Sequence, residues 1–433
     1  MDQPARRGIG AVIVVLASSW ILTACSEPLP PSAAKTEAPA GCTKDLLACA
    51  RRSMLAPYVP TKATKATGTP IRLGMVNQEN TAAGSYPELS QAVAAATEFI
   101  NTELGGVDGR PIEVEVCNTE FSTEGSTSCG QGFVEQEVPA VLGGIDVFGN
   151  AIDTLAENEI PYVGGIPISP QSVESPNSFQ WSGGGWGATV AFSWFAAEEL
   201  GAEKVAIVYG DFGSIADGAR AGQEVLQAAG VADVAMVPFP VITTDMASPL
   251  QAAMATDPDA IIILAADAAC KAAFDASNAM GISAAMFYTG ACAAPTITEA
   301  AGNEATEGAY FSVEGAVNRE NPDADNQLYT SVMAAYAPEL DPIGVATVSA
   351  RSMMNLFSVL SLTKPEQVDA ESITALLRSQ RNTPSFMGHD YTCDGKQFPG
   401  LPAACSPQQI LVRMQDGQLE QVGGWIDVGA ANG

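Results

Sequence analysis

Basic residues and histidine are scarce in this sequence. It has 20 lysines and arginines against 49 aspartates and glutamates, and its formal net charge is −29 at pH 7. Such a chain repels the phosphates of nucleic acids, so we expect no nucleic-acid partner. Histidine occurs once, as His389, and no Cys-x-x-Cys motif is present, so a zinc site would have few ligands. We therefore expect neither a metal nor another cofactor.

The apolar run near the N-terminus is too short to span a membrane. It follows Arg6 and Arg7 and ends in LTAC at residues 22–25, whereas a membrane-spanning helix needs roughly 20 apolar residues. Basic residues, a short apolar run and small residues before a cysteine resemble the signal peptide and lipobox of bacterial lipoproteins. We expect residues 1–24 to be a signal peptide and Cys25 to carry a lipid, which makes the protein extracytoplasmic and membrane-anchored. The alternative is an ordinary secretory signal in which Cys25 is incidental.

The segment after the expected anchor should be a tether. Residues 26–40 are rich in proline, alanine and serine and show no apolar periodicity, so they predict an extended chain. We assign residues 25–68 to this tether, together with a small segment that holds Cys42 and Cys49. About 365 residues remain, which is more than one comfortable hydrophobic core, so two domains are expected.

The cysteines outside the signal segment indicate disulfides. Nine cysteines are present, and an even number remains without Cys25. An even number in an exported chain predicts disulfides, although sequence alone leaves many pairings open. The short separations favour pairing between neighbours: Cys42 with Cys49, Cys117 with Cys129, Cys270 with Cys292, and Cys393 with Cys405.

Signatures of catalysis are missing. No Gly-x-Ser-x-Gly turn is present, and His389 stands beside no credible nucleophile in the sequence. Gly183, Gly185 and Ala188 fit the dinucleotide-binding pattern formally, but the strand before them would be short and polar, and an exported protein has poor access to nicotinamide cofactors. Residues 321–326 (NPDADN) lack the later glycine and glutamate of an EF-hand calcium loop. We do not expect an enzyme.

From residue 69 onwards, short apolar runs alternate with longer helical stretches. This alternation predicts a βα architecture. Strands are expected at residues 71–76, 112–116, 140–142, 162–163, 205–209, 234–237, 260–264, 285–288 and 309–313. Helices are expected at residues 89–104, 193–200, 218–229, 249–255, 269–280 and 345–362, where apolar residues recur at spacings of three and four.

The C-terminal region shows a different pattern. Two apolar runs, residues 409–414 and 419–425, flank Asp416 and Gly417. Because Asp-Gly readily adopts the positive φ angles of a tight turn, the pattern predicts an antiparallel hairpin. We expect this hairpin to extend one edge of a sheet.

Four stretches carry a family resemblance: INTELGGVDG at residues 100–109, VLGGID at 141–146, IPYVGGIPISP at 160–170 and VAIVYGD at 205–211. The glycines of the first stretch can end a helix in the left-handed conformation and let the chain turn directly into a strand. Together these stretches resemble the branched-chain amino acid and amide binding proteins, the type I solute receptors of ATP-driven importers. The resemblance extends over nearly all of residues 69–428.

The resemblance implies an α/β fold of two doubly wound, Rossmann-like lobes joined by a three-crossover hinge, the periplasmic-binding-protein type I architecture. We place the crossovers near residues 183–187, 313–317 and 386–389. Lobe 1 then comprises residues 69–184 and 315–386, lobe 2 comprises residues 185–314 and 387–428, and residues 429–433 form a tail. A ligand would lie between the lobes, because open α/β sheets bind at the carboxyl ends of their strands.

The resemblance also implies which residues face the ligand: Tyr86, Phe148, Gly149, Asn150, Pro167, Ser169, Ile215, Asp267, Gly290 and Ala291. Amino-acid receptors of this family hold the ligand with a serine and a threonine, where this chain has Phe148-Gly149 and Ser169. Ala291 replaces the acidic residue that pairs with the ligand ammonium. Asp267 is either a substitute partner for that ammonium or a helix cap.

Trp186 is a further candidate because of its place in a glycine-rich stretch. We expect flexible hinge backbone there, where the indole either stacks on a ligand or packs within the hinge. Tyr86 likewise either contacts the ligand or covers the start of a helix. The altered positions favour a ligand with an apolar or aromatic face over leucine, isoleucine or valine, since a buried ammonium without a carboxylate is costly. Truncation of Trp186 should then weaken binding with little change in the melting temperature of the empty protein.

These features predict an extracytoplasmic solute-binding receptor of an ABC importer. We expect a monomer that captures a small molecule in the cleft between its lobes and delivers it to the permease subunits in the membrane. A ligand-sensing surface lipoprotein with the same fold and no transport role is the alternative.

Replacement of the predicted lipidation site tests the anchor. The native chain should partition with membranes, because its acyl chains bury apolar surface in the bilayer. Cys25→Ser should leave an unlipidated precursor or a soluble product. Detergent phase separation of the two forms measures the difference, and equal partitioning of both would contradict the lipid anchor.

Overall fold

The structure is a computed structural model that describes residues 42, 45–81, 84–241, 243, 245–266, 268–314, 323–364 and 368–431. The expected signal peptide, Cys25 and Asp267 lie outside the described residues, as do residues 315–322, which include part of the second expected crossover. Within the described ranges, no helix combines the length and the hydropathy needed to cross a membrane.

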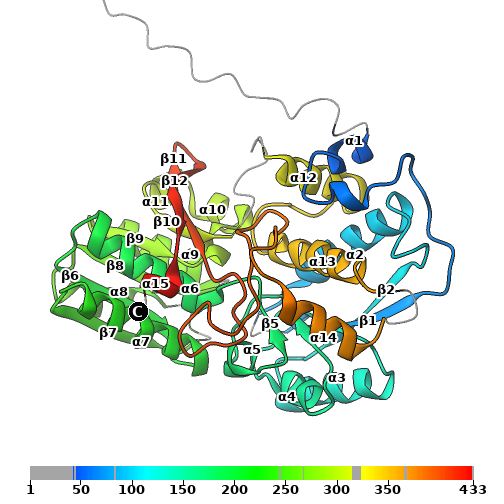
Figure 1. Ribbon diagram of the computed structural model, residues 1–433. Helices are drawn as coiled ribbons and strands as arrows, with labels where there is room; N and C mark the ends of the chain where they lie inside the picture. The colour runs from blue at the N-terminus through cyan, green and yellow to red at the C-terminus, as the bar shows by residue number, and fades with distance from the viewer. Residues whose placement is uncertain are drawn as a thin grey trace, which may run out of the picture. The chain divides into compact units, whose positions relative to one another are not determined.

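One sheet is built from the first part of the chain. In the described residues it has five parallel strands in the order β2-β1-β3-β4-β5 (Figure 1). Its strands are β1 (Ile71–Asn77), β2 (Ile112–Asn118), β3 (Val141–Gly143), β4 (Tyr162–Val163) and β5 (Ser178–Phe179). Leu73 and Met75 on β1 belong to the core on one face of the sheet, whereas Val76 belongs to the core on the other face. This burial on both faces is typical of a parallel sheet between two helical layers.

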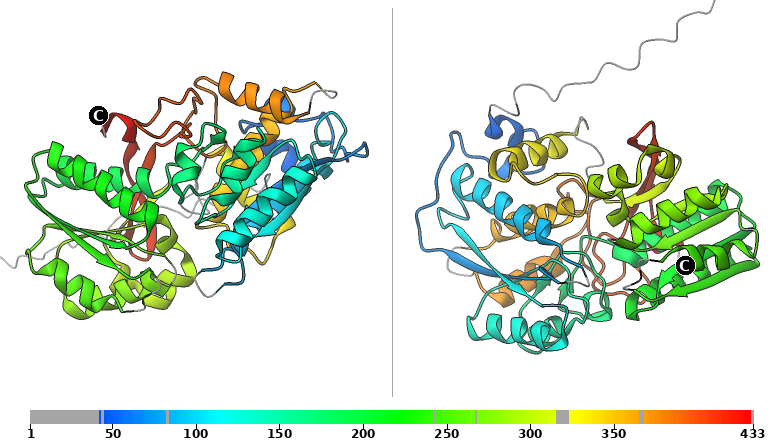
Figure 2. Two further views of the ribbon diagram at one scale, coloured as in Figure 1. Left: turned by 90° about the horizontal axis from the view of Figure 1, so that it is seen from below. Right: turned by 180° about the vertical axis from the view of Figure 1, so that it is seen from behind.

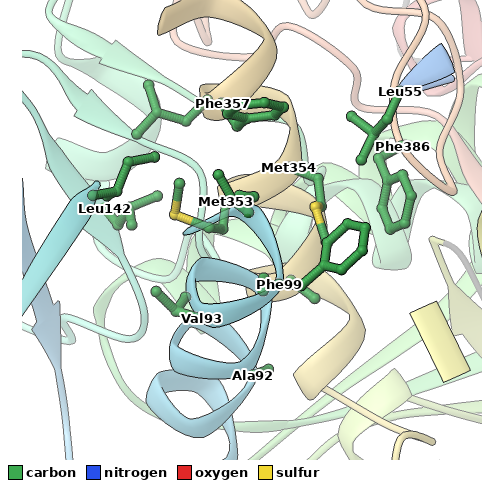
Figure 3. Packing of buried hydrophobic residues seen from close by; sticks show 14 of the residues in the cluster. Leu55, Ala92, Val93, Phe99, Leu142, Met353, Met354, Phe357 and Phe386 are labelled. Atoms are coloured by element: carbon green, nitrogen blue, oxygen red, sulfur yellow. The ribbon is translucent and has the colours of Figure 1, made fainter. Parts of the chain in front are cut away.

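Helices from two distant parts of the chain cover this sheet. They are α2 (Pro87–Thr102), α3 (Thr123–Glu135), α4 (Asn150–Glu157) and α5 (Pro170–Glu174), and from the returning chain α12 (Ala324–Tyr336), α13 (Ala346–Leu360) and α14 (Ala370–Ser379). α13 lies against α2 in the centre of the core, where Met353 and Met354 meet Val93 and Phe99 (Figure 3). α3 and α4 pack together on the opposite face. We call this sheet and its helices lobe 1.

A second sheet forms the core of lobe 2. Its order within the described residues is β12-β11-β10-β9-β8-β6-β7, and β6 to β10 are parallel. Its strands are β6 (Lys204–Gly210), β7 (Asp233–Phe239), β8 (Ala260–Leu264), β9 (Ala285–Tyr288), β10 (Tyr310–Val313), β11 (Gln409–Gln415) and β12 (Gln418–Ile426). One face carries α6 (Gly184–Trp194), α7 (Gly213–Ala228) and α15 (Val428–Ala431), and the other carries α8 (Ala247–Met254), α9 (Ala268–Met280), α10 (Pro295–Ala301) and α11 (Asn303–Thr306) (Figure 2). The predicted fold of two doubly wound α/β lobes is confirmed.

The C-terminal hairpin also agrees with the prediction. β11 and β12 pair antiparallel, and β12 forms one edge of the second sheet. Asp416 and Gly417 at the turn have φ angles of 50° and 75°, which are the positive values that such a turn requires. Every predicted strand is present, with ends shifted by no more than two residues.

Helix α6 begins where a flexible crossover was expected. It starts at Gly184 and runs on into a π-helical turn, η2 (Phe195–Glu199), so the helix predicted at residues 193–200 begins nine residues earlier than expected. The glycines at residues 183–185 suggested a loop, but Val190 and Phe192 are buried in the core of lobe 2. Burial of a helix face commonly outweighs the low helix propensity of glycine. The predictions also missed α3, which is glycine-rich and polar, and β5, which is too short to show periodicity.

The third connection between the lobes runs through a long irregular segment between α14 and β11. Tyr391, Cys393 and Cys405 in this segment belong to the core of lobe 1, whereas Phe398 and Ala404 pack against lobe 2. The lobe boundary at residues 386–389 therefore stays a proposal, and the packing favours a crossing closer to the start of β11.

The eight described cysteines pair with their neighbours as predicted: Cys42 with Cys49, Cys117 with Cys129, Cys270 with Cys292, and Cys393 with Cys405. Each bond joins residues within one local region of the chain. The disulfides therefore stiffen individual loops of the protein.

Part of the expected tether is folded. α1 (Leu46–Ala50) and η1 (Ala56–Tyr58) form a small cap that packs against α12, and Leu47, Cys49 and Leu55 belong to the core of lobe 1. The backbone N–H of Met54 donates a 2.8 Å hydrogen bond to one carboxylate oxygen of Asp325 on α12. The other oxygen accepts from the N–H of Met387 at 3.0 Å. The sequence prediction missed this cap because its apolar face is too short to show a helical period.

Asp325 makes the stability of the cap depend on pH. Burial raises the pKa of its carboxyl above the usual value, and the N–H donors of Met54 and Met387 oppose this shift. The folded state therefore binds a proton more tightly than the unfolded state, so the contribution of Asp325 to stability should fall as pH rises through the raised pKa. Urea unfolding of the wild type and of Asp325→Asn between about pH 3 and about pH 6 measures this contribution. We expect the wild-type advantage to shrink as pH rises, and an advantage that grows with pH would contradict the assignment.

Candidate ligand-binding cleft

A cavity of about 360 Å³ lies between the two lobes. Its walls include the segments that follow β1, β3 and β4 in the first sheet and β6, β8, β9 and β10 in the second. These segments stand at the carboxyl ends of parallel strands, the edge at which open α/β sheets bind ligands. The volume falls in the range of small-molecule sites, roughly 300–1,000 Å³.

Most side chains in the cavity wall are apolar. Lobe 1 contributes Tyr86, Phe121, Ile145, Val147, Ile166 and Ile168, and lobe 2 contributes Trp186, Phe212, Ile215, Phe239 and Leu264. Ser214, Thr289 and Ser312 add hydroxyl groups to the wall. Among the described lining residues, the charged side chain is that of Glu314. A wall of this composition suits an apolar or aromatic molecule that is oriented by a few polar groups.

The structure brings together about half of the residues predicted to face the ligand. Tyr86, Pro167, Trp186, Ile215 and Ala291 line the cavity, as does Gly290. Phe148, Gly149, Asn150 and Ser169 are not part of its wall, and Asp267 lies outside the described residues. The roles of individual residues in binding remain proposals.

The predicted residues outside the wall have structural positions. Gly149 caps α4 with a left-handed φ of 72°, and Asn150 is the first residue of that helix. Ser169 stands at the N-cap position of α5 and is fully buried, although its hydroxyl makes no capping hydrogen bond. The ring of Phe148 lies between those of Phe121, at 5.3 Å, and Phe212, at 6.1 Å. Phe148 and Phe121 belong to lobe 1 and Phe212 to lobe 2, so these rings meet across the cleft beside the cavity.

Sequence reasoning missed several parts of the wall. Phe212 and Ser214 directly follow β6, and the rule on strand ends would have identified them. Ile343, Val345 and Val348 come from the start of α13, far along the chain. No local pattern marks these three residues as neighbours of the earlier strands, because only the return of the chain into lobe 1 brings them there.

Trp186 occupies the first turn of α6 and not flexible backbone. It is 7% exposed, and its side chain forms part of the cavity wall. Gly184 precedes it with a φ of 55°, and a Cβ atom there would approach the Pro167 carbonyl oxygen to 2.4 Å. This glycine lets the start of α6 in lobe 2 come close to the Pro167 loop of lobe 1. The position of the Trp186 indole is therefore fixed by packing.

Glu314 makes the strongest polar interactions at the cleft. Its Oε2 accepts from Nη2 of Arg351 on α13 at 2.7 Å, and its carbonyl oxygen accepts from Nη1 at 2.5 Å. Its Oε1 accepts from the N–H of Gly183 at 2.8 Å and from Nε2 of Gln409. The two side chains are buried, at 3% exposure for Arg351 and 9% for Glu314. Arg351 thus balances the charge of the cleft carboxylate.

The Cys270–Cys292 disulfide supports the wall from behind. Cys270 lies in the first turn of α9, and Cys292 lies in the short helix η3 (Gly290–Ala293) that follows β9. The neighbouring residues Ala269 and Ala291 line the cavity. The bond therefore holds two wall segments of lobe 2 at a fixed separation, which lowers the cost of ordering them around a ligand.

The residues behind the alternative hypotheses from sequence have the following surroundings. His389 is half-buried, its Nδ1 lies 2.8 Å from the Asp390 carbonyl oxygen, and its ring packs at 5.5 Å from that of Trp425. Across the described part of the chain, no cluster of three or more histidine, cysteine, aspartate or glutamate side chains could hold a metal ion. Gly183 contacts the Glu314 carboxylate, so the start of α6 is occupied by protein groups.

Two doubly wound lobes with a cavity between the carboxyl ends of their strands define the class of two-lobed α/β binding proteins. Residues 70–401 match the family model described as periplasmic binding protein, and the chain belongs to this family. None of the curated proteins matches it by sequence.

Solved structures agree with this assignment. The leucine-binding protein LivK from Thermotoga maritima is 18% identical, with a TM-score of 0.65 over 82% of this chain and 98% of its own. The branched-chain amino acid transporter substrate-binding protein LivJ from Streptococcus pneumoniae, in complex with isoleucine, is 17% identical, with a TM-score of 0.66 over 82% and 99%. An ABC transporter solute-binding protein from Rhodopseudomonas palustris HaA2, in complex with p-hydroxybenzoic acid, is 20% identical, with a TM-score of 0.68 over 83% and 98%. At this identity the likeness establishes the fold alone.

The position of Trp186 changes the expected effect of its truncation on stability. Because the indole is nine-tenths buried, Trp186→Ala should lower the free energy of unfolding by about 2–4 kcal/mol, and the open cavity beside it keeps the loss below that of a fully packed tryptophan. Trp425→Ala is the matched control, since its side chain on β12 is 36% exposed and should cost less than about 1 kcal/mol. Urea unfolding followed by circular dichroism compares the two, and equal losses would contradict the packed position of Trp186.

Proposed function

We propose that this protein is the extracytoplasmic solute-binding receptor of an ABC importer and that it captures a small molecule between its two lobes. The observation that supports this most directly is one cavity lined by the strand ends of both sheets. A ligand in such a position contacts both lobes and stabilises their closed arrangement. We further propose lipid anchoring through Cys25, a monomeric state, delivery to permease subunits and no enzymatic activity.

The chemistry of the wall points to the class of solute. Glu314 is already neutralised by Arg351 and accepts two further hydrogen bonds, so it offers no free carboxylate to an ammonium group. A buried ammonium without such a partner is costly. Ser214 and Ser312 are free to donate to a ligand, since their hydroxyls bond to no group among the described residues. We therefore propose a solute with an apolar or aromatic face and one or two hydrogen-bond acceptors.

The proposed ligand contacts are Tyr86, Pro167, Trp186, Ile215 and Ala291. Trp186 and Tyr86 supply rings from opposite lobes, which can hold a flat molecule between them. Asp267 stays a proposed contact from the loop after β8. Free leucine, isoleucine and valine should bind poorly, because each carries an ammonium that the described wall cannot pair.

A ligand screen tests the proposed function. In thermal-shift measurements on amino acids, amides, nucleobases and aromatic acids, binding to the native state should raise the melting temperature. We expect aromatic acids or amides, with p-hydroxybenzoic acid as the first probe, to give larger shifts than valine or leucine. Tight binding of valine or leucine would refute the solute class, and no shift with any probe would count against the receptor function.

A cavity-filling variant links binding to this cleft. Ala291→Phe places a ring in the cavity wall and should weaken p-hydroxybenzoic acid binding at least about tenfold by calorimetry, because the ring occupies the space of the solute. Ala279→Phe, at the exposed far end of α9, is the matched control and should leave the affinity unchanged. Equal affinities for the two variants would place the binding site elsewhere.

A further inference from the structure

Three separate connections between the lobes meet at one carboxylate. Gly183 belongs to the first connection, Glu314 begins the second directly after β10, and Gln409 ends the third at the start of β11. The Glu314 side chain accepts hydrogen bonds from both of the other connections, and it is paired with Arg351, which lies on α13 of lobe 1. We infer that Glu314 is the pivot of the hinge, a positioning residue that fixes the axis about which the lobes close.

The connections pack closely around the carboxylate. A Cβ atom at Gly183 would lie 2.5 Å from the Pro407 carbonyl oxygen and 2.8 Å from Nε2 of Gln409, so the first and third connections are in direct contact. A Cβ atom at Gly388 would lie 3.0 Å from Nη1 of Arg351, so the third connection also touches the guanidinium. We infer that the lobes rotate about these contacts as they close.

The Glu314 carboxylate makes all of its polar contacts within the hinge. Both of its oxygens accept hydrogen bonds, and Arg351 balances its charge. A buried ion pair is a weak source of stability, because desolvation offsets much of the attraction. Here the ion pair fixes the geometry of the hinge. It joins Arg351 on α13 of lobe 1 to Glu314, the first residue after β10 of lobe 2, in one arrangement.

This inference rests on the proposed function, because a pivot matters only if the lobes close on a ligand. The apparent affinity of such a receptor scales with the fraction of molecules that are competent to close. A loosened pivot spreads the empty protein over more interlobe arrangements and so lowers that fraction. In Gly183→Ala the affinity should fall although Gly183 is not part of the cavity wall.

The experiment measures the lobes directly in the empty protein. Spin labels at Glu135→Cys on α3 and Glu224→Cys on α7, both exposed, report the interlobe distance distribution by double electron–electron resonance. Glu314→Gln is compared with Glu420→Gln, an exposed glutamate on β12. Gly183→Ala, which keeps every charge, is compared with Gly424→Ala, where a Cβ atom would meet nothing within 4 Å.

Glu314→Gln and Gly183→Ala should broaden or shift the distance distribution, whereas both controls should match the wild type. Their affinity for p-hydroxybenzoic acid should fall about three- to tenfold. If Glu314→Gln fails to fold, Gly183→Ala tests the pivot alone, because Arg351 keeps its partner Glu314 in the Gly183→Ala variant. A distribution equal to that of the wild type in either folded variant overturns the pivot. Absence of binding in the wild type would instead contradict the proposed function. The interlobe distances of the variants would still show whether Glu314 is the pivot.

Discussion

The joining of the two lobes depends on the Glu314 carboxylate. Each lobe has its own hydrophobic core, and the first and third connections between the cores, which the structure describes, are irregular. Irregular backbone that is buried leaves N–H groups without the partners that a helix or sheet would supply. A carboxylate can accept from several donors at once, and Arg351 makes its burial tolerable. The polar interaction at the cleft is thus a consequence of how the chain connects the lobes.

The apolar character of the cavity follows from the same arrangement. Glu314, the charged residue of the described wall, is hydrogen-bonded within the hinge. The remaining surface of the cavity is made of rings, aliphatic side chains and a few hydroxyls. Apolar area removed from water contributes about 25 cal/mol per Å² to binding, and that gain is reduced by any ordering of the wall. The Cys270–Cys292 bond and the packed start of α6 reduce this ordering cost on the side of lobe 2.

The elements of the fold could be predicted from sequence because their signals are local. Buried strands such as β8 are continuous apolar runs, and the Asp416-Gly417 turn determines the hairpin by its backbone requirements. The resemblance placed the crossovers, but the contacts of Glu314 could not be predicted, since Glu314 is 131 residues from Gly183 and 95 from Gln409. The same holds for the cavity wall, where residues after strands were identifiable and those at the start of α13 were not. Trp186 lines the cavity, but it lies in α6 and not in the flexible backbone that was expected, because its glycine neighbours hide a buried helix face.

Buried carboxylates recur wherever irregular segments of this chain meet. Asp146 accepts from the Ser126 hydroxyl at 2.7 Å in the loop before α4, and burial raises its pKa. Asp325 joins the N-terminal cap to Met387, and the next residue, Gly388, packs against Arg351 of the hinge. The cap, which lies before the residues matched by the family model, is therefore connected to the hinge through two carboxylates in series.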